Sequence, residues 1–411
     1  MTQDTAQAPA GRFAAFASPG YRAYWTGLML NGFAVQIQTV AVGWYVYDLT
    51  GNALDLGLVG LSQFAPALLL VFITGSVADR FSRRTIMAIS LVAEAVTAAI
   101  LLAVTALGLA TPLPIFGAMA LFGVARAFYN PARQSIVPNL VPDAHLANAI
   151  AANSTVNQFA TICGPVLGGF LYAAGPHYAY GTSIVLLIAA SAIIALGVPR
   201  QNRPGSRGPA GWETLSAGFR YIWAQKPVLG AISLDLFAVL FGGAMALLPV
   251  YAADILEIGP EGLGLLRAGP AIGAIVMAVA FMLRPIRNHA GIIMFLAVAG
   301  FGAATLVFAL SESLWLSFAM LVLIGGFDMV SVNIRQILLQ IWTPDDVRGR
   351  VNAVNQVFVG ASNELGAFRA GVMAVWIGPV AAVALGGAAI LAVAGAWAAL
   401  FPDLRKVQRL R

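Results

Sequence analysis

The sequence predicts an all-α integral membrane protein whose roughly twelve transmembrane helices form two six-helix bundles related by a pseudo-twofold axis. Three observations carry this prediction. Apolar stretches near the ~20 residues that a bilayer core demands recur along almost the whole chain. The composition is 60% hydrophobic and 10% charged, with a mean hydropathy of +0.84, which leaves too little polar surface for a soluble globule of 411 residues. The second half also repeats features of the first at a constant offset.

The first half of the chain begins with a short polar segment and continues as six spans. Residues 1–20 contain Asp4, Pro9 and Arg12 but no apolar core followed by a small-residue cleavage site, so we expect a cytoplasmic segment and no removable signal peptide. The expected spans are 22–47, 53–78, 85–108, 112–134, 147–174 and 178–198. Residues 21–198 therefore form the expected N-terminal bundle.

A long polar connection, 199–227, separates the two halves. Pro204, Gly205, Gly208 and Pro209 are typical of a linker, and the amphipathic run around Trp212–Trp223 predicts a short interfacial helix. The remaining spans are expected at 228–253, 262–284, 290–310, 314–341, 350–374 and 377–401. Residues 228–401 thus form the expected C-terminal bundle, and 402–411 form a cytoplasmic tail.

The basic residues predict the orientation. Of the 23 lysines and arginines, 20 are assigned to the even-numbered gaps between spans or to the termini, and Arg335 is one of these 20. The three exceptions are Arg126, Arg267 and Arg369. The odd-numbered gaps instead hold acids such as Asp48, Asp254 and Glu312. The positive-inside rule then places both termini in the cytoplasm, as an even number of spans also requires. The formal charge of +6 reflects this orientation, and we expect no nucleic acid partner.

The halves repeat at an offset of 202 residues. Arg133-Gln134 falls on Arg335-Gln336, and Pro142-Asp143 falls on Pro344-Asp345. Asn153, Gly164 and Gly169 fall on Asn355, Gly366 and Gly371 in the same way. Parallel repeats of this kind predict a binding site between the halves near mid-membrane, opened alternately to each side by rocking.

The loop between spans two and three carries a specific motif, Gly75-Ser76-Val77-Ala78-Asp79-Arg80-Phe81-Ser82-Arg83-Arg84. It resembles the signature loop of the major facilitator superfamily, G-x-x-x-D-R-x-x-R-R, and matches every fixed position. The resemblance implies the major facilitator fold and a conformational latch formed by Gly75, Asp79, Arg80, Arg83 and Arg84, which holds the halves in the outward-facing state. The alternative is a positive-inside charge cluster and nothing more.

Span five carries a second motif, Gly164-Pro165-Val166-Leu167-Gly168-Gly169. It resembles the antiporter motif of the superfamily's exporters, with Gly164, Pro165, Gly168 and Gly169 as the matching positions. The resemblance implies proton-driven efflux. The alternative is a helix-packing hinge of the kind found in many transporters.

Further segments, among them Trp44–Gly51, Asn130–Gln134 and Thr343–Asn352, are similar to the bacterial branch of enterobactin exporters and multidrug efflux permeases. This likeness extends from about residue 20 to 401. Since one fold serves many cargoes, it indicates the fold better than the substrate.

Ionisable residues at membrane depth are costly and are functional candidates by default. Arg126 in span four and Asp328 in span ten occupy equivalent positions under the 202-residue shift. We predict that they pair in at least one conformation and that protonation of Asp328 releases Arg126. The alternative is a permanent structural ion pair. Asp235 in span seven and Glu364 in span eleven are the other proton-coupling candidates. Solvation of Asp235 and a structural or bundle-bridging role of Glu364 remain alternatives.

The resemblance implies that spans one, four, seven and ten line the central cavity. Asn31 and Gln38 lie seven residues apart on span one and share a helix face, which makes them the preferred polar contacts. Aromatic rings on these spans offer apolar area for a cargo. The expected lining residues are Asn31, Gln38, Arg126, Phe128, Tyr129, Phe237 and Phe241.

Together these features predict a secondary active transporter, a proton-coupled antiporter in the bacterial inner membrane that exports an amphipathic small molecule such as a siderophore-like metabolite or a drug. An importer, a symporter or a lipid flippase on the same fold is the alternative. The spans hold no catalytic constellation, so we expect no enzyme activity and no cofactor. One cysteine, Cys163, and no histidine within the spans argue against a metal site. A monomer suffices for the fold.

Overall fold

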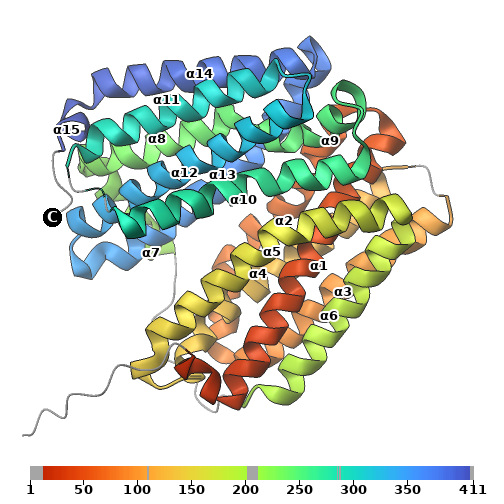
Figure 1. Cartoon of the computed structure of the whole chain (residues 1–411). Coiled ribbons are helices and arrows are strands. Elements are labelled where there is room, and N and C mark those ends of the chain that lie inside the picture. The colour runs from red at the N-terminus through yellow and green to blue at the C-terminus, as the bar shows by residue number, and fades with distance from the viewer. Residues whose placement is uncertain (1–12, 109–110, 201–211, 285, 287, 408–411) are drawn as a thin grey trace, which may run out of the picture.

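The structure, a computed structural model, describes residues 13–108, 111–200, 212–284, 286 and 288–407. Its long elements are all helices (Figure 1). The N-terminal half contains α1 (Pro19–Thr50), α2 (Ala53–Arg80), α3 (Arg83–Ala106), α4 (Leu113–Ile136), α5 (Leu146–Ala174) and α6 (Pro176–Gly197). The C-terminal half contains α8 (Lys226–Gly242), α10 (Gly259–Leu283), α11 (Ala290–Ala309), α12 (Leu314–Trp342), α13 (Asp345–Ile377) and α14 (Pro379–Leu400). Short elements are η1 (Ala14–Ala17), η2 (Val137–Asn139), η3 (Asp143–His145), α7 (Trp212–Ala224) and α15 (Pro402–Arg405).

Local sequence explains where the helices begin and end. Ser18 and Asn52 cap the N-termini of α1 and α2, with side-chain oxygens that accept from the backbone N–H groups of Tyr21 and Leu54. Between them, Gly51 ends α1 with a left-handed φ of 58°, which glycine adopts without strain. The tight α1–α2 turn therefore sends the chain directly back across the bundle.

Helix packing confirms the internal repeat. In the N-terminal bundle α1 packs against α5 and α6, α3 against α4 and α6, and α2 against α4. In the C-terminal bundle α8 packs against α13 and α14, α11 against α12 and α14, and α10 against α12. Every pair has its counterpart when each helix is matched to its repeat partner. The prediction of two bundles related by the repeat is therefore confirmed, and these contacts are consistent with six helices in each.

Nine helices of the described residues are long and apolar enough to cross a membrane by composition alone. The other long helices, α1, α5 and α13, carry many polar residues, including Gln36 on α1, Asn157 on α5 and Glu364 on α13. These three helices lie at the centre of the contact network: α5 and α13 join the bundles, and α1 packs on α5. Their lower hydropathy is the expected result of contact with protein in place of lipid.

The seventh span departs from the expected continuous helix over 228–253. After α8 the chain turns at Gly243, whose φ is 57°, and then forms η4 (Ala244–Leu247), α9 (Leu248–Val250) and the π-helix η5 (Tyr251–Ile255). The pair Gly242-Gly243 permits the left-handed turn, and Pro249 lacks the N–H that would continue an ordinary hydrogen-bond ladder. The span is therefore discontinuous near its middle.

The two bundles meet through α5 with α10 and α2 with α13. Glycines make both contacts close. A Cβ atom at Gly57 of α2 would lie 2.9 Å from the Phe368 Cα, and one at Gly371 of α13 would lie 2.8 Å from the Ala53 carbonyl oxygen. On the other side, Gly169 of α5 faces the Pro260 carbonyl and Gly264 of α10 faces the Pro165 carbonyl.

These contacts lie toward one end of the molecule. The opposite end, here called the basic end, holds the start of α1, the α2–α3 turn, α7 and α15, and toward it the bundles diverge (Figure 1). Apolar side chains on the part of α2 that approaches the basic end are exposed, among them Leu69 and Ile73 at 76% and 51%. If the basic end is cytoplasmic, as the sequence predicts, this is an inward-facing arrangement.

We expect Gly264→Leu to destabilise the protein by about 1–3 kcal/mol, because the new side chain must push α10 away from the α5 backbone. Thermal unfolding of the detergent-solubilised protein measures the effect. Gly181→Leu is the matched control, since a Cβ atom there meets nothing within 4 Å. Equal unfolding temperatures for the two variants would contradict the close contact.

Candidate functional site

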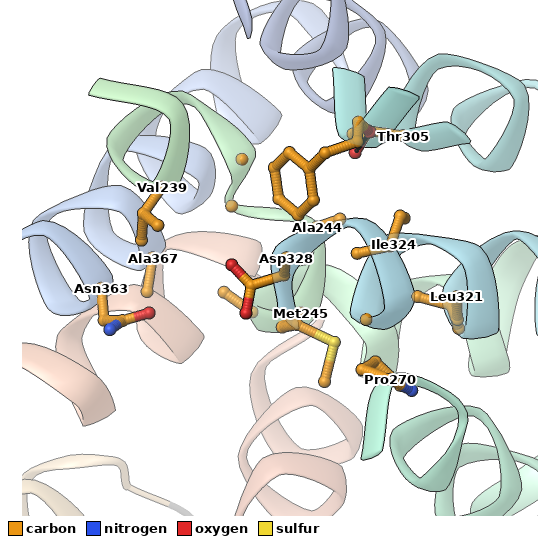
Figure 2. Close-up of a pocket in the computed structure, with 15 residues that line it drawn as sticks. Val239, Ala244, Met245, Pro270, Thr305, Leu321, Ile324, Asp328, Asn363 and Ala367 are labelled. Atoms are coloured by element: carbon orange, nitrogen blue, oxygen red, sulfur yellow. Dashed lines mark hydrogen bonds between the residues drawn. The ribbon is translucent and has the colours of Figure 1, made fainter. Parts of the chain in front are cut away.

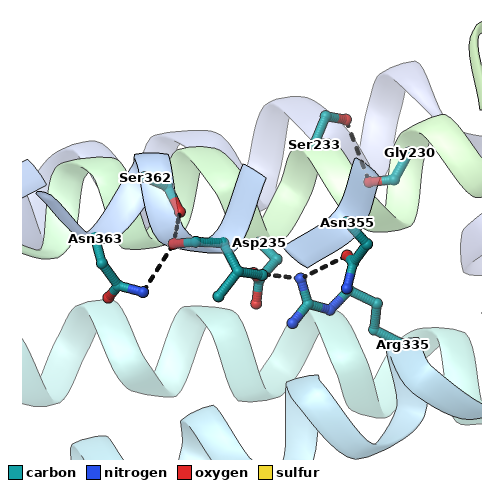
Figure 3. A network of polar contacts seen from close by, with 8 residues as sticks. Gly230, Ser233, Asp235, Arg335, Asn355, Ser362 and Asn363 are labelled. Atoms are coloured by element: carbon teal, nitrogen blue, oxygen red, sulfur yellow. Dashed lines mark hydrogen bonds and ion pairs between the residues drawn. The ribbon is translucent and has the colours of Figure 1, made fainter. Parts of the chain in front are cut away.

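A buried ion pair ties α8 to α12 inside the C-terminal bundle. Arg335 Nη1 lies 2.5 Å from Asp235 Oδ2, and the two side chains are 4% and 6% exposed. The same nitrogen donates to Asn355 Oδ1 of α13 at 3.5 Å (Figure 3). The expectation that Arg335 belongs to a basic gap is wrong, because it lies within α12, and Asp235 is buried instead of solvated.

The N-terminal bundle contains a different network at the matching place. Asn31 Nδ2 of α1 donates to Glu94 Oε2 of α3 at 2.8 Å, and Glu94 is fully buried. At an offset of 204 residues, two more than elsewhere in the repeat, Phe33-Ala34-Val35 falls on Phe237-Ala238-Val239, and Asn31 then falls on Asp235. The N-terminal bundle thus buries Glu94, which accepts from the Asn31 amide, and the C-terminal bundle buries Asp235, which pairs with Arg335.

Arg126 and Asp328, the predicted partners, do not form an ion pair in this conformation. Arg126 lies over the Phe122 ring, with its Cζ 5.6 Å from the centroid, and its charge acts on Glu94. The charges that act on Asp328 are those of Asp235 and Arg335. Within the described part of the chain, Arg335–Asp235 is the sole ion pair within 4 Å. Pairing of Arg126 with Asp328 in another conformation stays a prediction.

Asp328 lines a cavity of about 200 Å³ beside the break in the seventh span. Figure 2 shows its carboxylate in the middle of the cavity, with Asn363 of α13 to one side and Met245 of η4 below. Thr305 of α11 lies at the far wall. Most of the other lining groups are apolar. A carboxylate with no hydrogen bond to any described residue therefore borders a small space inside the bundle.

Glu364 lies at the contact between the bundles. A Cβ atom at Gly60 of α2 would be 2.6 Å from Glu364 Oε2, so the carboxylate rests on the backbone of the other bundle. Arg369, one turn further along α13, has a different role. It donates to the carbonyl oxygens of Leu240 at 2.9 Å and Phe241 at 2.6 Å, which the break after α8 leaves without helical partners.

The other expected lining residues are packed inside the bundles. Asn31 and Gln38 share a face of α1, but they are 4% and 1% exposed. Tyr129 is 1% exposed within the core of the N-terminal bundle. The remaining aromatic candidates also pack against neighbouring helices. Phe237 lies 5.1 Å from Trp397 of α14, Phe241 lies under Arg369, and Phe128 borders an apolar pocket between α2, α3 and α4.

One contact between the bundles could not be predicted from the sequence. At the end opposite the basic end, the Tyr47 hydroxyl of α1 donates to Asp254 Oδ2 on the π-helix η5. Tyr47 ends the first predicted span and Asp254 lies in the predicted gap after the seventh, and no repeat counterparts link them. The pairing depends on the π-helical turn, which the sequence pattern did not show.

Comparison with known proteins decides the family. Residues 10–410 match the family of major facilitator proteins described as transmembrane secretion effectors. The chain belongs to this family. It is 26% identical over 366 residues to the uncharacterized MFS-type transporter YfiS of Bacillus subtilis, covering 81% of each chain. It is also 26% identical over 406 residues to the enterobactin exporter EntS of Escherichia coli O1:K1, covering 95% of this chain and 94% of EntS.

Solved structures show the same fold. The nucleoside transporter NupG superposes with a TM-score of 0.69 at 14% identity, covering 93% of this chain and 98% of NupG. A bacterial homologue of the iron transporter ferroportin, in an inward-facing state, superposes with a TM-score of 0.70 at 15% identity, covering 94% and 98%. At these identities the likeness concerns the fold alone. The chain is therefore a major facilitator transporter in its family and its architecture.

The motifs shared with the superfamily lie where helices of this transporter contact each other closely. Gly164 and Gly168 of α5 lie against α1, where Cβ atoms would meet Gln36 Cβ at 2.6 Å and Ile37 Cα at 2.9 Å. Together with Gly169, which faces α10, they let α5 approach a helix of each bundle. In the first turn of α3, Arg84 Nη1 donates to the Val198 carbonyl at 3.0 Å.

The rest of the predicted latch lies at the end of α2 and the start of α3. Arg80 is exposed at the end of α2, and Arg83 begins α3. Gly75 and Asp79 fall within α2, but their surroundings lie outside the described residues. The latch stays a prediction for a conformation in which the basic ends approach each other.

Asp235→Leu should destabilise the protein by about 3–5 kcal/mol, because Arg335 would remain buried without a counter-ion. The double variant Asp235→Leu/Arg335→Met should regain most of this loss, since it removes both charges. A double-mutant cycle of thermal unfolding in detergent measures the coupling, with the exposed Asp403→Asn as a control. Additive losses would show that the two residues do not stabilise each other.

Proposed function

We propose that this transporter is a proton-coupled antiporter that exports an amphipathic small molecule from the cytoplasm across the bacterial inner membrane, with both termini cytoplasmic. The observation that carries the proposal is the position of Asp328 and Glu364. Both are carboxylates within membrane-spanning helices, near the middle of α12 and α13, and neither has a hydrogen bond or ion pair with another described residue. A carboxylate left unpaired at membrane depth is suited to carry a proton.

The two carboxylates differ in what rocking would do to them. Glu364 rests on α2 of the other bundle, so separation of α2 from α13 changes its surroundings directly. Asp328 faces a cavity within its own bundle and senses Asp235 and Arg335. We therefore propose that Glu364 binds or releases a proton when the bundles rotate. We propose that Asp328 is the carboxylate at which a proton and the cargo replace each other.

Antiport requires that proton and cargo exclude each other, and this coupling is reciprocal. The cargo must therefore contact the carboxylate that carries the proton, through a hydrogen-bond donor or a cationic group. The apolar walls around Asp328, with Asn363 and Thr305 as the polar exceptions, suit a cargo that is apolar except at a few points. Likeness to the enterobactin exporter supports export over import.

The arrangement of contacts supports a rocking cycle. In the state described, the Tyr47–Asp254 hydrogen bond and the glycine contacts close one end, while the basic ends are apart. Export requires that the closed end opens and that the loop with Asp79, Arg80 and Arg83 meets the C-terminal bundle. The rigid helices make such a change a rotation of whole bundles.

Asp328→Asn should lower proton-driven transport at least tenfold, because an amide cannot exchange a proton for cargo. Inverted membrane vesicles, energised by respiration, measure it as the collapse of the pH gradient when enterobactin or an amphipathic dye is added. Asp403→Asn is the control, since Asp403 is exposed on α15. Unchanged gradient collapse in Asp328→Asn would remove this residue from the mechanism, and accumulation of cargo only in right-side-out vesicles would indicate import.

Tyr47→Phe should raise the outward-facing share about fivefold, because it removes a hydrogen bond of about 1 kcal/mol that exists only when that end is closed. Spin labels at Gln134 and Gln336, both exposed near the basic ends of α4 and α12, report the separation in a Cys163→Ser background. Tyr178→Phe on α6 is the control, since its ring is 53% exposed. An unchanged distance distribution for Tyr47→Phe would show that this bond does not hold the closed state.

A further inference from the structure

The amphipathic helix α7 is firmly attached to the C-terminal bundle along one face. A Cβ atom at Gly218 would lie 2.6 Å from the Arg350 carbonyl oxygen of α13. The Tyr221 hydroxyl donates to the Trp342 carbonyl at the end of α12 at 2.8 Å, and Ile222 is 1% exposed. The helix is therefore a fixed part of the basic end.

A second face of α7 is apolar and remains open. Phe219 and Trp223 stack on each other at 5.9 Å and are 46% and 67% exposed. With Val354, Val357 and Phe358 of α13 they line a groove of about 830 Å³, and Phe219 meets Phe358 edge to face at 6.2 Å. No described residue covers these rings. An apolar groove of this size on a transporter requires an occupant.

The position of the groove points to the lipid leaflet. With 33 residues and about 1.5 Å per residue, α13 is about 50 Å long and exceeds the ~30 Å hydrocarbon core of a bilayer. Val354 to Phe358 come about three turns after its start at the basic end, which places them near the boundary between headgroups and acyl chains. An exposed tryptophan such as Trp223 is typical of that boundary.

The rim of the groove is basic. Arg220 lines the groove and is exposed. Arg350, one turn before Val354 on α13, is also exposed, and its backbone contacts α7. Two cations from separate elements therefore stand beside an apolar groove at headgroup depth. This combination complements an anionic phospholipid, whose acyl chain is apolar and whose phosphate is negative.

We propose that the groove between α7 and α13 is a binding site for an anionic phospholipid of the cytoplasmic leaflet. The acyl chain lies against Phe219, Trp223 and Phe358, and the phosphate accepts hydrogen bonds from Arg220. Guanidinium groups bind phosphate through several N–H donors, which gives the headgroup a defined place. A lipid bound here contacts both α7, which belongs to the connection between the two halves, and α13, which carries Glu364.

Native mass spectrometry of the full-length protein in detergent tests this site. Phosphatidylglycerol and phosphatidylcholine with identical acyl chains are the two probes. We expect the wild type to retain phosphatidylglycerol in preference to phosphatidylcholine. Arg220→Gln and Trp223→Ala should each weaken phosphatidylglycerol binding at least fivefold, and Arg220→Lys should keep most of the preference.

Matched controls separate this groove from general lipid association. Arg405→Gln removes an exposed cation of α15, and Trp376→Ala removes a ring that is 81% exposed at the other end of α13. Both controls should bind phosphatidylglycerol like the wild type. Equal retention of the two lipids by the wild type would overturn the proposal, as would binding by Arg220→Gln and Trp223→Ala that matches the two controls. Thermal unfolding without added lipid verifies that each variant is folded.

Discussion

A charge inside a bilayer needs a partner from the protein, and this constraint organises the interior of the transporter. Arg369 uses the carbonyl groups freed by the break after α8, and Arg335 uses Asp235 and Asn355. Glu94 uses the Asn31 amide. These groups hold helices of one bundle together, and a proton carrier cannot be so firmly engaged. Among the described charged residues within the spans, Arg126, Arg267, Asp328 and Glu364 lack such partners, and they have freedom to change partners.

The internal repeat determines how the helices pack, and the charged residues that differ between the two halves determine the electrostatics of each bundle. Arg133 and Arg335 are counterparts, but Arg133 donates to the neutral Asn157 at 3.3 Å whereas Arg335 binds a carboxylate. Arg126 and Asp328 are counterparts of opposite charge. A strictly symmetric pair of bundles would place like charges at matching depths, where they would repel each other across the axis. The exchange of sign removes that repulsion and gives each bundle a distinct electrostatic character.

Much of the architecture was predictable from the sequence, because it follows from hydropathy and from the 202-residue repeat. The discontinuity of the seventh span was not, since Gly242-Gly243 inside an apolar run also fits a continuous helix. Partners were harder to predict than positions. The contact between Asp235 and Arg335 depends on the rotation of α8 against α12, which the positions of the two residues along the chain do not reveal. Glu94 is a further case, since its partner, Asn31, lies 63 residues away in the chain. Asn31 and Gln38 were correctly placed on one face, but helical spacing alone does not tell whether a face looks into the bundle or between the bundles.

The glycine contacts between the bundles explain why an interface can be both well packed and reversible. At Gly57, Gly371, Gly169 and Gly264 the backbones touch without interlocking side chains. Large interdigitated side chains would have to withdraw from their holes before the bundles could rotate, whereas backbone surfaces separate with little repacking. The open basic end must then offer a comparable surface when it closes, or one state would dominate the equilibrium. The side chains of α2 that are exposed near that end, Leu69 and Ile73 among them, are apolar. Burial of such side chains on closure offsets the loss of the glycine contacts at the other end, so the two states can be close in free energy.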